Sequence, residues 1–160
     1  MTMAMMRTFG FDDLELGQCA SLMRTVMESD VVGFAQVSGD HNPIHLSDDY
    51  AASTKFGQRI AHGMLTASLI SAVIGTQMPG PGAVYLSQTL RFLGPVKIGD
   101  VVTAMVEVAE KIEKGRRVRL DCRCVVDGRS VLEGEAWVSV PPSASRSRSA
   151  DQFGASGFGA

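Results

Sequence analysis

The sequence has few of the residues that define the specialised protein classes. Its three cysteines, Cys19, Cys122 and Cys124, are an odd number without the spacing of a zinc knuckle or a disulfide framework. Lys and Arg number 15 against 17 Asp and Glu, so the net charge of −2 gives no general attraction to nucleic acid. We therefore expect a protein of the reducing cytoplasm that does not bind nucleic acid.

Long apolar runs are also missing. The most apolar stretch, 64–75, is interrupted by Thr66, Ser68 and Ser71. It falls far short of the roughly 20 residues that cross a bilayer. The N-terminal segment suits neither secretion nor organelle import, because acidic residues follow its short apolar run. We expect no membrane-spanning segment.

What is present fits one globular domain and a tail. Apolar residues make up 45% of the 160 residues and charged residues 20%, as in an ordinary folded protein. Past Pro141 and Pro142 the composition changes to Ser, Arg, Gly and Ala, with too few large apolar residues to fold. The sequence predicts a folded domain over 1–142 and a disordered tail over 143–160.

The first half of the domain predicts a strand and two helices. Residues 18–27 favour a strand, and Ser29 or Asp30 can cap a helix that stops at Gly39. Residues 40–62 are rich in turn formers and predict an ordered connection with one helical turn near 49–52. Residues 63–77 are apolar on nearly every side and predict a buried helix.

The second half predicts four antiparallel strands, rich in Val and Leu and separated by Gly, Pro, Lys and Asp turns. They cover 83–93, 101–112, 116–127 and 131–140. A sheet of about five strands with a single apolar helix must wrap that helix to bury it. The pattern indicates an α+β hot-dog fold. Such a sheet leaves an edge strand that can pair with a second copy, so we expect a homodimer.

The long connection contains a candidate catalytic pair. In Ser38-Gly39-Asp40-His41-Asn42-Pro43-Ile44-His45, a carboxylate and an imidazole lie five residues apart around an Asn-Pro turn. An Asp and a His that share one water molecule can activate it for hydration or hydrolysis. The alternative is structural, because Asp, Asn and Pro are also common turn residues.

A second motif opens the buried helix. Ala61-His62-Gly63-Met64 stands where free backbone N–H groups and the helix dipole stabilise negative charge. Gly63 allows a ligand to approach closely, and a thioester carbonyl there would have its enolate-like transition state stabilised. The simpler alternative is that Gly63 only avoids a clash at the helix start.

These residues resemble the MaoC-like family of (R)-specific enoyl-CoA hydratases. The family signature is an aromatic residue, then Ser-Gly-Asp-x-Asn-Pro-aliphatic-His, and then a small residue. Here it is matched by Phe34, 38–45 and Ala51. The likeness continues through 61–65 and the Tyr85-Leu86 strand, and it covers about residues 14–140.

The resemblance implies a dimeric hot-dog enzyme that adds water reversibly to trans-2-enoyl-CoA and gives (R)-3-hydroxyacyl-CoA. It implies no metal and no redox cofactor, since coenzyme A is part of the substrate. Asp40 and His45 would be the catalytic pair, and the N–H of Gly63 would receive the thioester oxygen. The implied setting is fatty acid metabolism, including the supply of polyhydroxyalkanoate precursors.

Further substrate-site candidates follow from the same resemblance. Asn42 matches a residue that fixes the loop, and Ser71 matches a serine that lines the pocket. The acyl tunnel would lie along the subunit interface, with Leu65, Leu69 and Val84 as candidate lining residues. Each of these three also fits a plain core position.

Other functions remain open at this stage. A dehydratase acting on 3-hydroxyacyl-[acyl carrier protein] would use the same residues. A non-catalytic acyl-CoA-binding module or a thioesterase would share the fold. A metal site would need His41 and His45 to meet Cys122 and Cys124, and a hydrophobic strand face explains both cysteines better.

Overall fold

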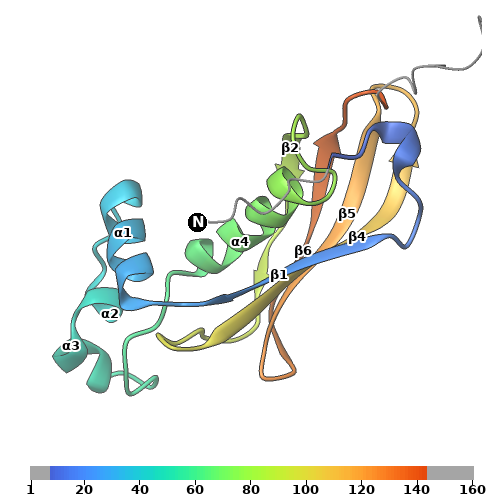
Figure 1. Ribbon diagram of the computed structural model, residues 1–160. Coiled ribbons are helices and arrows are strands. Elements are labelled where there is room, and N and C mark those ends of the chain that lie inside the picture. The colour runs from blue at the N-terminus through green and yellow to red at the C-terminus, as the bar shows by residue number, and fades with distance from the viewer. Residues whose placement is uncertain (1–7, 144–160) are drawn as a thin grey trace, which may run out of the picture.

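The computed structural model describes residues 8–143, which form one antiparallel sheet with a long helix against it (Figure 1). The strands are β1 (Cys19–Thr25), β2 (Val84–Gln88), β3 (Arg91–Phe92), β4 (Val101–Ile112), β5 (Arg117–Val126) and β6 (Arg129–Ser139). The helices are a short 3-10 turn, η1 (Phe11–Asp13), followed by α1 (Glu28–Ser38), α2 (Pro43–Leu46), α3 (Asp48–Ala52) and α4 (Gly63–Thr76).

The sheet order is β1-β4-β5-β6-β2, and β3 pairs with β6. The sheet is not closed into a barrel, so β1 and β2 are its edges. Figure 1 shows α4 lying along one face of this sheet. The predicted α+β hot-dog architecture is therefore confirmed.

The core lies between α4 and the central strands. Every second residue is buried from Val102 to Val108 in β4 and from Val118 to Val126 in β5, and buried residues pair across the strands, as Val106 does with Cys122. The face of α4 that meets them buries Leu69, Ile70, Val73 and Ile74. Each such side chain stabilises the fold by about 1.5–3 kcal/mol. The Met78-Pro79 pair then ends the helical segment, as the sequence predicts.

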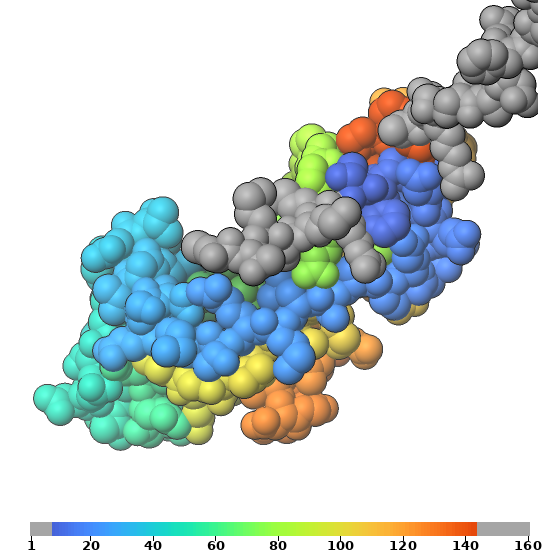
Figure 2. Space-filling view, viewed as in Figure 1, coloured from blue at the N-terminus to red at the C-terminus, as the bar shows by residue number. Residues whose placement is uncertain are grey.

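Helices α1 to α3 form a lobe that projects beyond the sheet, at the left of Figures 1 and 2. The Asp30 carboxylate accepts a hydrogen bond from Met27 N–H at 2.9 Å, which caps the start of α1. Gly39 ends α1 with a φ of 79°, a conformation that glycine adopts without strain. The predicted helix ending at Gly39 is confirmed, but its predicted start is wrong: Met27 is the N-cap, and Ser29 and Asp30 lie in the first helical turn, where Asp30 bonds back to Met27.

The connection 40–62 is more helical than its composition predicts. Asn42 accepts a hydrogen bond from Ile44 N–H and caps α2, with Pro43 in the first helical position. The Ser47 hydroxyl accepts from Tyr50 N–H and caps α3. The expectation of a single helical turn was therefore incomplete, because turn-forming residues here start two consecutive short helices.

The predicted strand 83–93 is divided into β2 and β3. Thr89 lies between them, and its carbonyl oxygen approaches Gly134 of β6 so closely that a Cβ at Gly134 would lie 1.8 Å away. The pairing of β2 with β6 also shifts register between Tyr85 and Ser87. This interruption gives six strands where the sequence predicts about five.

The predicted tail, 143–160, lies outside the described residues apart from Ser143. In the described part of the chain, every helix is too short or too polar to cross a membrane.

Candidate active site

The loop after α1 holds Asp40 in a fixed position. The Ser38 hydroxyl donates to Phe34 O at 2.6 Å and accepts from Asp40 N–H at 3.2 Å. The backbone N–H of Asn42 donates to Asp40 Oδ1 at 3.1 Å. One carboxylate oxygen is therefore anchored by the backbone, and Oδ2 is directed toward His45.

His45 lies in α2 and is almost fully buried. Its Nδ1 lies 2.8 Å from the carbonyl oxygen of Ile60. Because a carbonyl only accepts hydrogen bonds, Nδ1 carries the hydrogen, and the Nε2 of the neutral ring presents a lone pair.

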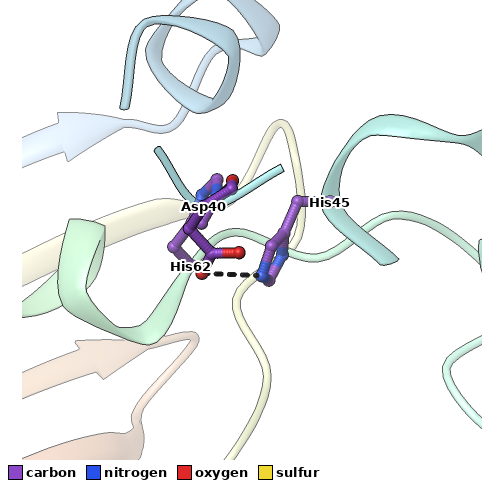
Figure 3. A group of neighbouring side chains, drawn as sticks. All are labelled: Asp40, His45 and His62. Atoms are coloured by element: carbon purple, nitrogen blue, oxygen red, sulfur yellow. Dashed lines mark hydrogen bonds and ion pairs between the residues drawn. The ribbon is translucent and has the colours of Figure 1, made fainter. Parts of the chain in front are cut away.

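His45 Nε2 and Asp40 Oδ2 face each other across 4.0 Å (Figure 3). This separation is longer than a direct hydrogen bond. The Asp40 side chain is 52% exposed and that of His45 is 10% exposed, so solvent reaches the pair from the Asp40 side. The geometry lets both groups contact one shared water molecule.

A second histidine lies against this pair. His62 is 2% exposed, and its Nε2 lies 3.0 Å from the backbone carbonyl oxygen of Asp40. Its ring centroid is 3.8 Å from that of His45 and 4.9 Å from that of Phe34. The motif that opens α4 contains His62, but the sequence predicts no role for its side chain, because the partners of this ring come from other segments of the chain.

The start of α4 completes the site. Leu65 N–H and Thr66 N–H bond to His62 O, whereas the N–H groups of Gly63 and Met64 precede the first helical hydrogen bonds. A Cβ at Gly63 would lie 2.7 Å from Cε1 of Phe92, so glycine is needed for the ring to pack there. These N–H groups and the dipole of a 14-residue helix favour a negatively charged oxygen.

These groups share one cleft of about 740 Å³. Asp40, His45, His62 and Gly63 contribute to its wall, and most of the remaining lining is apolar. The larger apolar side chains around the cleft are Phe34, Phe56, Ile60, Met64, Phe92, Leu93, Val96 and Val131. The cleft can therefore enclose an apolar chain with its reactive end at the polar groups.

The other predicted substrate-site residues lie outside the lining of this cleft in the single chain. Leu69 belongs to the core and Leu65 packs against it. Ser71 is exposed on α4, and Val84 is 58% exposed on the edge strand β2. Asn42 is also exposed and caps α2.

Metal binding fits the site poorly. Asp40, His45 and His62 each offer a ligand atom within 4.8 Å of the others. However, the two imidazoles stack with only 32° between their planes, so their in-plane lone pairs do not converge as in a tetrahedral site.

The alternative metal site with two cysteines fits still less well. Cys122 and Cys124 are buried in the core cluster. Burial raises the pKa of the Cys122 thiol to about 11 and that of Cys124 to about 12. A metal requires thiolates, which these environments disfavour.

Known proteins resemble this chain over most of its length. The sequence profile of the MaoC like domain matches residues 17–127. The 3-hydroxybutyryl-CoA dehydratase of Methylorubrum extorquens is 59% identical over 136 residues, which are 85% of this chain and 87% of that protein. The (R)-specific enoyl-CoA hydratase of Rhodospirillum rubrum is 52% identical, over 82% of this chain and 91% of its own.

A solved structure shows the same arrangement of the backbone. R-hydratase PhaJ1 from Pseudomonas aeruginosa superposes with a TM-score of 0.80 at 48% identity, covering 84% of this chain and 87% of the other. With the profile match and these identities over most of the chain, the protein belongs to the MaoC-like dehydratase family.

Proposed function

We propose that the protein is an (R)-specific enoyl-CoA hydratase, a hydro-lyase that adds water reversibly to trans-2-enoyl-CoA to give (R)-3-hydroxyacyl-CoA. The observation that carries the proposal is the facing pair of His45 Nε2 and Asp40 Oδ2, 4.0 Å apart, in the same cleft as the N–H groups that start α4. The relatives named for CoA-thioester hydration and dehydration support it.

The pair supplies the attacking water. His45 Nδ1–H donates to the Ile60 carbonyl, so Nε2 takes a proton from water while Asp40 Oδ2 orients that water. The water oxygen bonds to C3 of the substrate, and the electrons of the C2–C3 double bond move toward the thioester carbonyl. C2 then takes a proton from the pair, so one water is added and the enzyme regains its starting state.

The start of α4 stabilises the charge that this step creates. The thioester oxygen becomes enolate-like as C3 is attacked, and the N–H of Gly63 donates to it. A preorganised donor of this type typically contributes about 10²–10³ in rate. This addition moves a water and a proton, so the proposed reaction uses coenzyme A only as part of the substrate.

We infer that the active assembly is a homodimer. The edge strand β2 exposes Val84, Tyr85 and Leu86. Phe92 of β3 and Leu93, the residue after it, are exposed as well. An apolar edge strand of this kind pairs with another strand or risks aggregation. Pairing of two β2 edges would join two sheets, and it would bring Val84 from the surface to the interface.

We place this activity in the cytoplasm, in fatty acid metabolism or the supply of polyhydroxyalkanoate precursors. The support is the (R)-3-hydroxyacyl product, which is the repeating unit of such polyesters. The (R)-hydratase of A. caviae, a solved structure described as involved in PHA biosynthesis, supports the polyester setting, since it superposes on this chain with a TM-score of 0.78 at 44% identity.

The activity is tested with purified protein and crotonyl-CoA, followed by the loss of enoyl-thioester absorbance. A coupled (R)-specific 3-hydroxyacyl-CoA dehydrogenase identifies the product, and longer trans-2-enoyl-CoAs give the chain-length profile. We expect hydration with (R) product. Hydration of the enoyl group only on acyl carrier protein, or an (S) product, would overturn the proposal.

A further inference from the structure

The buried ring of His62 takes no part in the reaction proposed above, yet it contacts both members of the pair. It is 2% exposed and stacks on His45 with centroids 3.8 Å apart. Its Nε2 lies 3.0 Å from the main-chain oxygen of Asp40, a residue 22 positions earlier in the chain.

The hydrogen-bond pattern of His62 is unusual for a core histidine. The Asp40 carbonyl can only accept, so the ring hydrogen is on Nε2. Nδ1 is buried and has no hydrogen-bond partner among the described residues. A buried acceptor without a partner destabilises a fold, and each such group in a native protein calls for an explanation.

His62 also does not cap its own helix. It is the N-cap residue of α4, but its side chain makes no capping hydrogen bond there. The ring instead reaches across to the Asp40 loop, while the His62 main chain leads directly into Gly63. One residue therefore connects the water site to the N–H groups that start α4.

We propose that His62 is a positioning residue. It holds the Asp40–His45 pair at a fixed distance from the anion site, which we define as the N–H groups of Gly63 and Met64 at the start of α4. This inference rests on the proposed hydratase function. Donation from Nε2 fixes the Asp40 main chain, and stacking fixes the plane of the His45 ring. Both contacts begin at the residue before Gly63, so the water and the thioester oxygen are held at a constant separation.

Two substitutions separate this role from a structural one. His62→Phe keeps an aromatic ring beside His45 and Phe34 but cannot donate to Asp40 O. It also removes the unpartnered Nδ1, which offsets the lost hydrogen bond to Asp40 O, so we expect thermal stability close to that of the native protein. His62→Gln keeps an N–H donor of similar reach and lacks the ring.

We expect His62→Phe to lower kcat for crotonyl-CoA by about 10- to 100-fold with KM within about threefold, since small displacements of reacting groups have effects of this size. His62→Gln should recover a substantial part of that kcat. Tyr50→Phe is the control, because Tyr50 is exposed on α3 and outside the cleft lining, and it should retain native kcat. Native kcat in a folded His62→Phe, or no recovery in His62→Gln, overturns the proposal.

A measurement independent of catalysis tests the same contact. Nitrogen-15 NMR of the histidine side chains should show His62 as the Nε2–H tautomer, with a ring proton that exchanges slowly with solvent. A Nδ1–H tautomer or a rapidly exchanging proton contradicts the positioning role even if no acyl-CoA is hydrated. Conversely, the expected spectrum without hydration of any enoyl-CoA would mean that the proposed function, and not this contact, is wrong.

Discussion

At the scale of single residues, the two members of the catalytic pair differ in exposure. Asp40 faces solvent and is anchored by backbone N–H, whereas His45 is buried and oriented by the Ile60 carbonyl. The sequence motif identifies both residues, because their spacing is local. The role of His62 could not be predicted in this way, since its partners come from two other segments that only the fold brings together.

Gly63 is predicted to be intolerant of even a methyl group. The added Cβ of Gly63→Ala would lie 2.7 Å from the Phe92 ring, so that ring, which lines the cleft, would have to shift. We expect kcat/KM for crotonyl-CoA to fall about tenfold or more, because the anion site and the acyl site are both disturbed. Gly75→Ala in the same helix is the control, as a Cβ there meets nothing within 4 Å. Equal activity of the two variants would contradict this account of Gly63.

The buried thiols predict a loss of stability in alkali. Burial raises the pKa of Cys122 to about 11 and of Cys124 to about 12, from the ordinary 9.0. Below pH 9 both thiols stay protonated whether the chain is folded or unfolded, so their contribution is fully present. As pH rises through 9 toward 11 and 12, the unfolded chain loses protons that the folded chain retains. The free energy of unfolding should therefore fall by on the order of 1 kcal/mol per pH unit for each thiol.

Urea denaturation between pH 8 and 10.5 measures this slope. The double variant Cys122→Ala, Cys124→Ala should have a flatter dependence on pH, whatever its absolute stability. Ser21→Ala is the control, because Ser21 is exposed and its hydroxyl does not titrate in this range, so the slope should stay unchanged. A slope that is the same in all three proteins would show that the two buried thiols do not titrate as described.

At the scale of elements, α1 and α4 could be predicted because the residues that stop them, Gly39 and Met78-Pro79, directly follow each helical pattern. The start of α1 could not, because its N-cap, Met27, has no side chain that caps a helix. The helices α2 and α3 could not be separated, since Asn42 and Ser47 are as typical of turns as of helix caps. The break between β2 and β3 could not be predicted either, because it depends on the close approach of Thr89 to Gly134 of β6, a strand far away in the sequence.

The lobe of short helices is held by one arginine. Arg59 donates to Glu28 of α1 and to Asp48 of α3, each at 2.7 Å, and hydrogen bonds to these carboxylates raise the pKa of its guanidinium. Ile60, the next residue, supplies the carbonyl that orients His45. Arg59 therefore connects the packing of the lobe to the geometry of the site.

Arg59→Met keeps the apolar stem and removes both ion pairs. We expect the free energy of unfolding to fall by about 1 kcal/mol, because both carboxylates are solvent-exposed. We expect kcat to fall as the Ile60 carbonyl loses its fixed place, and hydrogen exchange in 43–62 to accelerate. Arg91→Met, which removes an exposed ion pair with Glu133, is the control and should leave that exchange unchanged. Native hydrogen-exchange rates in Arg59→Met would show that the ion pairs of Arg59 do not hold this segment in place.

At the scale of the whole molecule, the exposed edge of β2 is the feature that most directly predicts assembly. A charge on this edge should prevent pairing of two sheets. We expect Leu86→Lys to halve the mass measured by light scattering and to lower activity. Met23→Lys on the opposite edge strand β1 is the matched control, because Met23 is also exposed, and it should leave the mass unchanged. A monomeric native protein with full activity would refute the dimer.

The central claim is that Asp40 and His45 act as one unit on one water molecule. A double-mutant cycle of Asp40→Asn and His45→Gln, read as kcat for crotonyl-CoA hydration in folded proteins, tests it most directly. Each single substitution should lower kcat by about 10²–10⁴. The kcat of the double variant should be only slightly lower than that of the less active single variant. Losses that multiply in the double variant, or a single variant that keeps native kcat, would show that the two residues do not share the reaction.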